Sequence, residues 1–159
     1  MRFLGIDPGT RLTGYGCLVQ QRGQTTIAEA GVIRLNEKTP IHHRLCELED
    51  DFRDLLDRTK PDAVAVEMLY SHYAHPTTAI VMGHARGVIL LVAQRKGLQL
   101  VELRPTEIKK SLTGHGHAKK DQIQRAIQDE FHLATLPKPP DVADALAIAL
   151  CALRRAKLA

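Results

Sequence analysis

The fold of this 159-residue chain is decided by its opening stretch RFLGIDPGT, residues 2–10. Its first six residues are typical of a buried strand, which ends in a turn at Asp7. Two further strands are predicted at Leu12–Gln20 and Thr25–Leu35, with a hairpin turn between them. The first three strands should therefore run antiparallel, with Asp7 at the end of the first.

Hydrophobic periodicity downstream of this hairpin predicts alternating helices and strands. Thr39 should cap the first helix, Pro40 should open it and Pro61 should end it. This order predicts an α/β fold in a single domain over residues 1–159, with a five-stranded mixed sheet flanked by helices and with the two later strands parallel to the first. The later helices are expected at Thr77–Lys96, Pro105–Leu112, Lys119–His132 and Asp141–Lys157, and the later strands at Asp62–Glu67 and Leu98–Leu103.

The net charge of +4 and the pI near 9.1 permit an anionic partner without requiring one. The distribution of charge is more informative than the sum. Acidic residues crowd residues 47–57, whereas basic residues concentrate between residues 104 and 125 and near the C-terminal end. The second half of the chain is therefore the expected place for contacts with a polyanion.

Cysteine number and hydropathy bear on the cellular compartment. Cys17, Cys46 and Cys151 are odd in number, scattered and without zinc-ligand spacing, so reduced thiols are expected. The N-terminus lacks a signal-peptide pattern, and the longest apolar run, Val88–Ala93, is too short to span a bilayer. We therefore expect a soluble cytoplasmic protein with no membrane contact.

Four acidic residues fall where the predicted fold would bring them together. Asp7 and Glu67 each end a strand, and if those strands are parallel neighbours, both side chains emerge at the same edge of the sheet. Asp141 and Asp144 are three residues apart on the last helix, so they share a face that must lie against the sheet. The expected result is one cluster of four carboxylates.

Four converging carboxylates repel one another unless a cation lies among them. Oxygen ligands suit Mg²⁺, for which Mn²⁺ can substitute, and two such ions about 4 Å apart can drive an in-line phosphoryl displacement. Taken singly, Asp7 can be only a turn residue and Asp141 only a helix-start acid. Glu67 and Asp144 are harder to explain in that way, because each lies in an apolar segment where an unpaired charge is costly.

Five motifs along the chain carry a family resemblance. In their order and spacing they resemble those of bacterial RuvC-type Holliday-junction resolvases, over essentially the whole chain. The resemblance implies a ribonuclease-H-like fold and a homodimeric, Mg²⁺-dependent endonuclease that resolves four-way DNA junctions by paired symmetric nicks in recombination and repair. The motifs are Ile6–Thr10, Thr13–Gly16, Val66-Glu67, Gly83–Gly87 and Asp141–Ala147.

The resemblance also implies roles for individual residues. Asp7, Glu67, Asp141 and Asp144 look like the family's acidic tetrad, which would hold two Mg²⁺ ions. His fills the place of Asp141 in some relatives, so direct metal contact is expected least of Asp141. The branch-migration proteins RuvA and RuvB are partners that the family implies.

Groups that could hold DNA follow in the same half of the chain or close to Glu67. Lys109, Lys110, Lys119 and Lys120 flank a glycine-rich loop, where their charges suit a DNA backbone. Lys109 and Lys120 resemble the family's functional lysines, and Tyr70 lies where the family has an aromatic residue that stacks on an unpaired base. The alternatives are solvated surface charges and a tyrosine that packs over its own loop.

A dimer interface is predicted on the long apolar helix. Gly83 and Gly87 lie on either side of Arg86, and small residues at that interval let another helix approach closely. We expect these three residues at the interface of a two-fold dimer, which would match the near two-fold symmetry of a four-way junction. The alternative is packing of this helix on the protein's own sheet.

Three other functions share parts of this pattern. The turn GIDPGT at residues 5–10 also resembles the phosphate-binding turn of sugar-kinase and actin-like ATPases, but those proteins need two such domains and a second glycine-rich loop. A non-catalytic DNA-binding module would not need all four acids. A nuclease acting on RNA–DNA hybrids uses the same ions, so only a comparison of substrates separates it from a junction resolvase.

Overall fold

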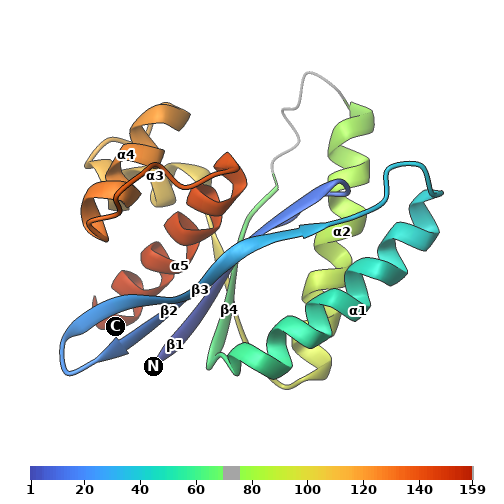
Figure 1. Ribbon diagram of the computed structural model, residues 1–159, viewed down its shortest axis with the longest axis horizontal. Coiled ribbons are helices and arrows are strands. Elements are labelled where there is room, and N and C mark those ends of the chain that lie inside the picture. The colour runs from blue at the N-terminus through green and yellow to red at the C-terminus, as the bar shows by residue number, and fades with distance from the viewer. Residues whose placement is uncertain (70–75, 159) are drawn as a thin grey trace.

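A five-stranded mixed sheet forms the centre of the molecule (Figure 1). The structure, a computed structural model, describes residues 1–69 and 76–158. The strands are β1 (Arg2–Asp7), β2 (Leu12–Gln21), β3 (Gln24–Arg34), β4 (Ala63–Glu67) and β5 (Gln99–Leu103). Their order is β3-β2-β1-β4-β5. The first three are antiparallel, and β4 and β5 run parallel to β1, which confirms the predicted topology.

Helices cover both faces of this sheet (Figure 1). One face carries α1 (Ile41–Thr59) and α2 (Pro76–Arg95). The other face carries α3 (Pro105–Thr113), α4 (Lys120–Glu130) and α5 (Pro140–Leu158). All the predicted helices and strands are present, with ends that differ from the prediction by two residues at most.

The predicted N-cap of α1 is wrong. The Thr39 hydroxyl donates to the backbone carbonyl of Asn36 at 2.8 Å, so it bonds back along the chain instead of to the first turn of the helix. α1 begins after Pro40 with no side-chain cap. The bond to Asn36 belongs to a tight turn in which the Thr39 N–H also donates to Asn36, and such a turn competes with capping for the same hydroxyl.

Strand alternation divides the core into two halves, one on each face of the sheet. On β1, Leu4 and Ile6 are fully buried on the α1 and α2 side, whereas Phe3 is buried on the α5 side. β4 repeats this pattern, with its valines on the first side and its alanines on the second. By the same alternation Asp7 and Glu67, at the ends of these two strands, project toward α5.

α5 lies so close to the sheet that backbone touches backbone. A Cβ atom at Gly5 would collide with the carbonyl oxygen of Ala145 and with Ala149. A Cβ atom at Gly14 would collide with the backbone of Asp141. Glycine on the strands and alanine on the helix therefore set the distance at which α5 passes over β1 and β2.

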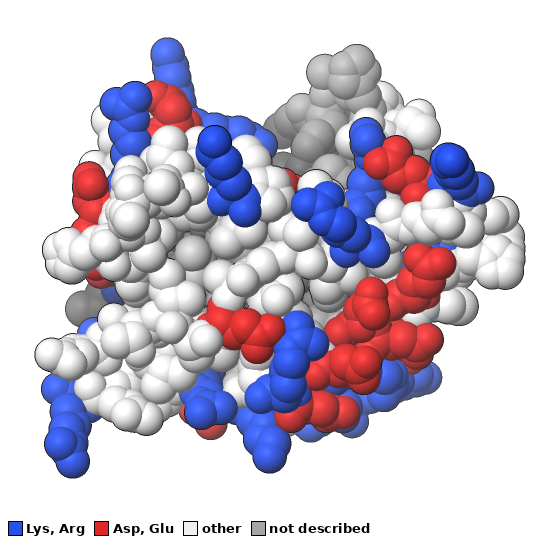
Figure 2. Space-filling view, viewed as in Figure 1, with Lys and Arg blue, Asp and Glu red and all other residues white. Residues whose placement is uncertain are grey.

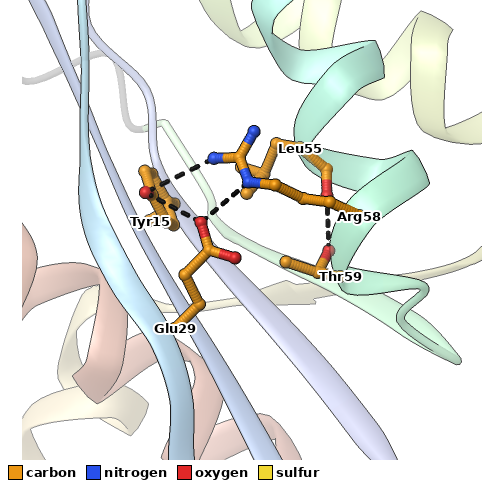
Figure 3. A network of polar contacts seen from close by, with 5 residues as sticks. All are labelled: Tyr15, Glu29, Leu55, Arg58 and Thr59. Atoms are coloured by element: carbon orange, nitrogen blue, oxygen red, sulfur yellow. Dashed lines mark hydrogen bonds and ion pairs between the residues drawn. The ribbon is translucent and has the colours of Figure 1, made fainter.

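A polar network ties α1 to the outer part of the sheet (Figure 3). The Tyr15 hydroxyl of β2 donates to Glu29 of β3 at 3.1 Å, and Arg58 Nε of α1 donates to the same carboxylate at 2.8 Å. The Arg58 guanidinium also lies 5.7 Å from the centre of the Tyr15 ring. Because the Arg58 side chain is 47% exposed, the network orients α1 and adds little to the free energy of unfolding.

α2 is long and apolar enough, by length and composition alone, to cross a membrane, with a mean hydropathy of 1.4 over its 18-residue window. In the structure it is a layer of the sandwich, and Ala85, Ile89 and Val92 are fully buried. Only 22% of that window is buried, however, and Ile80 and Leu91 are 62% and 49% exposed. Part of the outer face of α2 is therefore apolar and is left uncovered by the described residues.

Candidate active site

Asp7 and Glu67 lie side by side at one edge of the sheet. β1 and β4 are parallel neighbours, and their last paired residues are Ile6 and Val66. Asp7 and Glu67 follow directly, and both project to the face that α5 covers. The predicted convergence of these two acids is confirmed.

The turn that follows Asp7 is held from two directions. Thr13, fully buried on β2, accepts from the Gly9 N–H at 3.1 Å and donates to the Gly9 carbonyl at 2.8 Å. Arg44 of α1 donates to the Thr10 carbonyl at 3.1 Å. Sequence reasoning missed both supporting residues, although a buried threonine four residues after a glycine turn is a usable signal for Thr13.

A cavity of about 480 Å³ lies where α5 passes over these strand ends. Asp7, Glu67, Asp141 and Asp144 all line it. Asp141 and Asp144 come from the first turns of α5, and contact between Gly14 and the Asp141 backbone fixes the start of that helix over β2. The structure therefore brings together the four acids that the sequence singled out.

Two of the four predicted DNA-binding lysines belong to this cavity. Lys109 of α3 and Lys120 of α4 line it, and Lys120 Nζ lies 3.9 Å from Asp144 Oδ2. The Lys120 side chain is 84% exposed, so it is free to move toward another anion. Lys110 and Lys119 are exposed and do not line the cavity.

Burial and crowding of like charges raise the pKa of Asp7 from 3.8 to about 7. Burial has the largest effect, followed by repulsion from Asp144, Asp141 and Glu67. Lys120 opposes the shift and lowers the pKa. In the absence of a cation, Asp7 therefore holds a proton more tightly than an ordinary carboxyl group.

The other two perturbed acids show the same balance. Burial, then repulsion from Asp144, raises the pKa of Glu67, while Lys109 and Lys120 lower it. Burial likewise raises the pKa of Asp144, against the opposing effect of Lys120. The lysines at the cavity therefore offset only part of the cost of charging these carboxyl groups.

The donor chemistry of the cavity fits a hard divalent cation. Its four acids offer only oxygen ligands, as Mg²⁺ and Mn²⁺ prefer, and the described residues that line the cavity include no cysteine or histidine of the kind that favours zinc. Over residues 1–69 and 76–158, no group of three or more His, Cys, Asp or Glu side chains forms a ready-made metal site. A bound cation would therefore have to draw these carboxylates closer together.

The residues predicted for the dimer interface face different ways. A Cβ atom at Gly83 or Gly87 would meet no atom of the described residues within 4 Å, so the described part of the chain leaves space beside both glycines. The Arg86 side chain is only 16% exposed and turns toward its own sheet, where it pairs with Glu102. Tyr70, predicted to stack on a base, lies outside the described residues.

Comparisons with known proteins agree with this geometry. The family model described as "Crossover junction endodeoxyribonuclease RuvC" matches residues 3–152. A protein of that description from Rhodopirellula baltica is 43% identical over 148 residues, which cover 93% of this chain and 83% of the relative. The structure of Thermus thermophilus RuvC in complex with Holliday junction substrate is similar with a TM-score of 0.90 at 31% identity, covering 99% of this chain and 96% of that one. The predicted ribonuclease-H-like fold is thereby confirmed.

Proposed function

Since the chain belongs to the RuvC family of crossover junction endodeoxyribonucleases, we propose that it resolves four-way DNA junctions by paired, symmetric nicks. The observation that carries the proposal is the single cavity lined by Asp7, Glu67, Asp141 and Asp144. A protein that only bound DNA would have no need to gather four carboxylates around one cavity, because burial and mutual repulsion oppose the charged forms of Asp7, Glu67 and Asp144.

We propose that these four acids hold two Mg²⁺ ions, for which Mn²⁺ can substitute. When bound, such a pair would activate a water molecule and stabilise the leaving oxygen of the cut phosphodiester. The acids would supply the negative charge that binds the ions. Cation binding would also relieve the repulsion that raises the pKa of Asp7.

DNA would reach the cavity from the side of α3 and α4. Lys109 and Lys120 lie at the cavity and would contact the phosphates next to the cut, while exposed Lys110 and Lys119 would contact the backbone farther away. Tyr70 would stack on an unpaired base at the junction centre. The opposite face of the molecule is unsuited to DNA, because exposed acidic side chains gather over α1 (Figure 2).

We also propose a two-fold dimer through the outer face of α2. Ile80, Gly87 and Leu91 recur at helical spacing on that face, with His84 between them and Gly83 beside it. Arg86 lies at the edge of this face and is occupied within its own chain. A dimer would place two cavities about a two-fold axis, as paired cuts in a four-way junction require.

The remaining partners follow from the family and from the substrate. The branch-migration proteins RuvA and RuvB would act on the same junction, and the reaction would take place in the cytoplasm, where bacterial relatives keep their DNA. Coprecipitation of the protein with RuvA and RuvB on a synthetic junction would test the first point.

The test of the function is a cleavage assay on a synthetic four-way junction with Mg²⁺. Wild-type protein should make paired nicks that a ligase can reseal. Asp7→Asn should reduce the rate roughly 100-fold to 1000-fold, the scale seen when a group that stabilises a transition state is removed. Its junction affinity should not fall, because the change removes a negative charge near the phosphates.

Asp50→Asn is the matched control, since Asp50 is an exposed acid on α1 and should cut at the wild-type rate. Equal cutting by the Asp7→Asn and Asp50→Asn proteins would contradict the active-site assignment. Preferential cutting of an RNA–DNA hybrid in competition with the junction would instead favour the hybrid nuclease.

A further inference from the structure

The Arg86 side chain reaches from α2 to the end of β4, next to the candidate active site. Its Nε donates to the backbone carbonyl of Glu67 at 3.1 Å, and its Nη2 pairs with the Glu102 carboxylate. The Arg86 side chain is 16% exposed, whereas that of Glu102 is 48% exposed. One guanidinium therefore joins α2 to the ends of β4 and β5.

The Glu67 carbonyl lies at the end of β4, where the backbone hydrogen bonds between strands come to an end. The next N–H along the chain, from Met68, donates to the Leu103 carbonyl at 2.8 Å and is the last backbone bond of β4 toward β5. A carbonyl at a strand end needs a partner, and a charged donor supplies a stronger bond than a neutral one. Arg86 therefore fixes the peptide group of the residue whose carboxyl group lines the cavity.

The register of β4 and β5 explains why the side chains of Arg86 and Glu102 meet. Glu102 pairs with Val66, and Leu103 pairs with Glu67. Leu103 is buried on the α5 side, so alternation turns Glu102 to the α2 side, where Arg86 lies. The ion pair orients the guanidinium, and its Nε is then directed at the end of β4.

We propose that Arg86 is a positioning residue for Glu67, which it holds at the geometry needed for cleavage. The inference rests on the proposed nuclease function. It differs from the interface role, because Arg86 acts through its own chain and not through a partner. A misplacement of about 1 Å at a reacting group can cost roughly 100-fold in rate, so loss of this single anchor should be visible in the cleavage step.

The experiment measures the cleavage rate of pre-bound junction, junction affinity, dimer mass and melting temperature for the same variants. Arg86→Ala should lower the cleavage rate roughly 10-fold to 100-fold. It should keep the junction affinity within about twofold and leave the oligomeric state of the protein unchanged. Arg86→Lys should fall between Arg86→Ala and wild type, because one ammonium cannot reproduce the planar fork of donors. Glu102→Gln keeps the bond to Glu67 and should slow cleavage by less than about threefold.

Arg95→Ala is the matched control, because Arg95 lies on the same helix, is 60% exposed and should cut at the wild-type rate. Equal rates for the Arg86→Ala and Arg95→Ala proteins overturn the proposal while leaving the nuclease function intact. A monomeric Arg86→Ala protein assigns the residue to the interface and also overturns it. If Arg86→Ala does not fold, a wild-type cleavage rate for Arg86→Lys overturns the positioning role of Arg86. A wild-type protein that makes no nicks overturns both the positioning role and the proposed nuclease function.

Discussion

The two faces of the sheet are packed in different ways. On the α1 and α2 face, bulky side chains such as Leu48, Phe52 and Leu55 fill the space between helix and sheet. On the α5 face, the helix backbone rests directly on glycines of β1 and β2, with alanines between. The active-site acids belong to the second face. The four candidate catalytic acids, from distant parts of the chain, are thus held by the packing that has the least freedom to adjust.

This difference has a physical cause. A gap between side chains can close by changes of rotamer, but a contact between two backbones can relax only if a whole helix or strand moves. Side-chain packing on the α1 and α2 face should therefore absorb small changes. On the α5 face, one added methyl group should instead displace α5, including its start, where Asp141 and Asp144 lie.

Two neighbouring residues of β1 offer the strongest test of this contrast. Gly5→Ala adds one methyl group on the α5 face and should lower the free energy of unfolding by about 3 kcal/mol, because the methyl would overlap the Ala145 carbonyl. Ile6→Val removes one methyl group on the opposite face and should cost about 1 kcal/mol. Urea unfolding of the two variants measures both values, and an equal cost would remove the distinction between the faces.

The second test uses pH, because the α5 face holds Asp7, whose carboxyl group has a pKa raised from 3.8 to about 7. With the pKa of Asp7 raised from 3.8 to about 7, native protein retains a proton over this range that the unfolded chain has released. Protonation therefore favours the native state at low pH, and the stability of metal-free protein should fall as the pH rises toward about 8. Allowing for solvent in the open cavity, we expect a loss of about 2 kcal/mol.

Urea unfolding in EDTA at pH 5 and pH 8 measures this loss. The raised pKa values of Glu67 and Asp144 act in the same direction, so Asp7→Asn should remove part of the slope and not all of it. Mg²⁺ should restore stability at pH 8, since a ligand that binds only native protein stabilises it. A metal-free protein that is more stable at pH 8 than at pH 5 would contradict the assigned burial of these acids.

Local signals predicted most of the sheet and the four acids. Strand ends at Asp7 and Glu67 are marked by turn residues and by the end of an apolar run, and alternation then decides which way each acid points. The supporting contacts were not predictable in this way. Gly14 contacts the backbone of Asp141, and Arg44 donates to the Thr10 carbonyl. Each contact joins segments that are far apart in the sequence, so no local pattern predicts it.

The orientation of the Arg86 side chain was less predictable than the position of the glycines beside it. The sequence places Gly83, Arg86 and Gly87 in one motif, and the prediction treated them as one surface. Helical spacing puts the two glycines beside Ile80 and leaves Arg86 at the edge of that face, from which a long side chain reaches the sheet. Its partner Glu102 could have been suggested from the alternation of β5, because Leu103 beside it is apolar and buried.

The smallest expected effect on folding comes from the outer surface of α2, where no backbone or core contact is at stake. Ile80→Glu replaces a side chain that is 62% exposed, so the free energy of unfolding measured at low protein concentration should change by less than about 0.5 kcal/mol. If this surface holds a partner subunit, the buried charge should instead convert the dimer to monomer in analytical ultracentrifugation. Gln21→Glu, in the exposed β2–β3 hairpin, adds the same charge far from α2 and should leave the mass unchanged. An Ile80→Glu protein that remains a dimer would show that the apolar face of α2 serves something other than self-association.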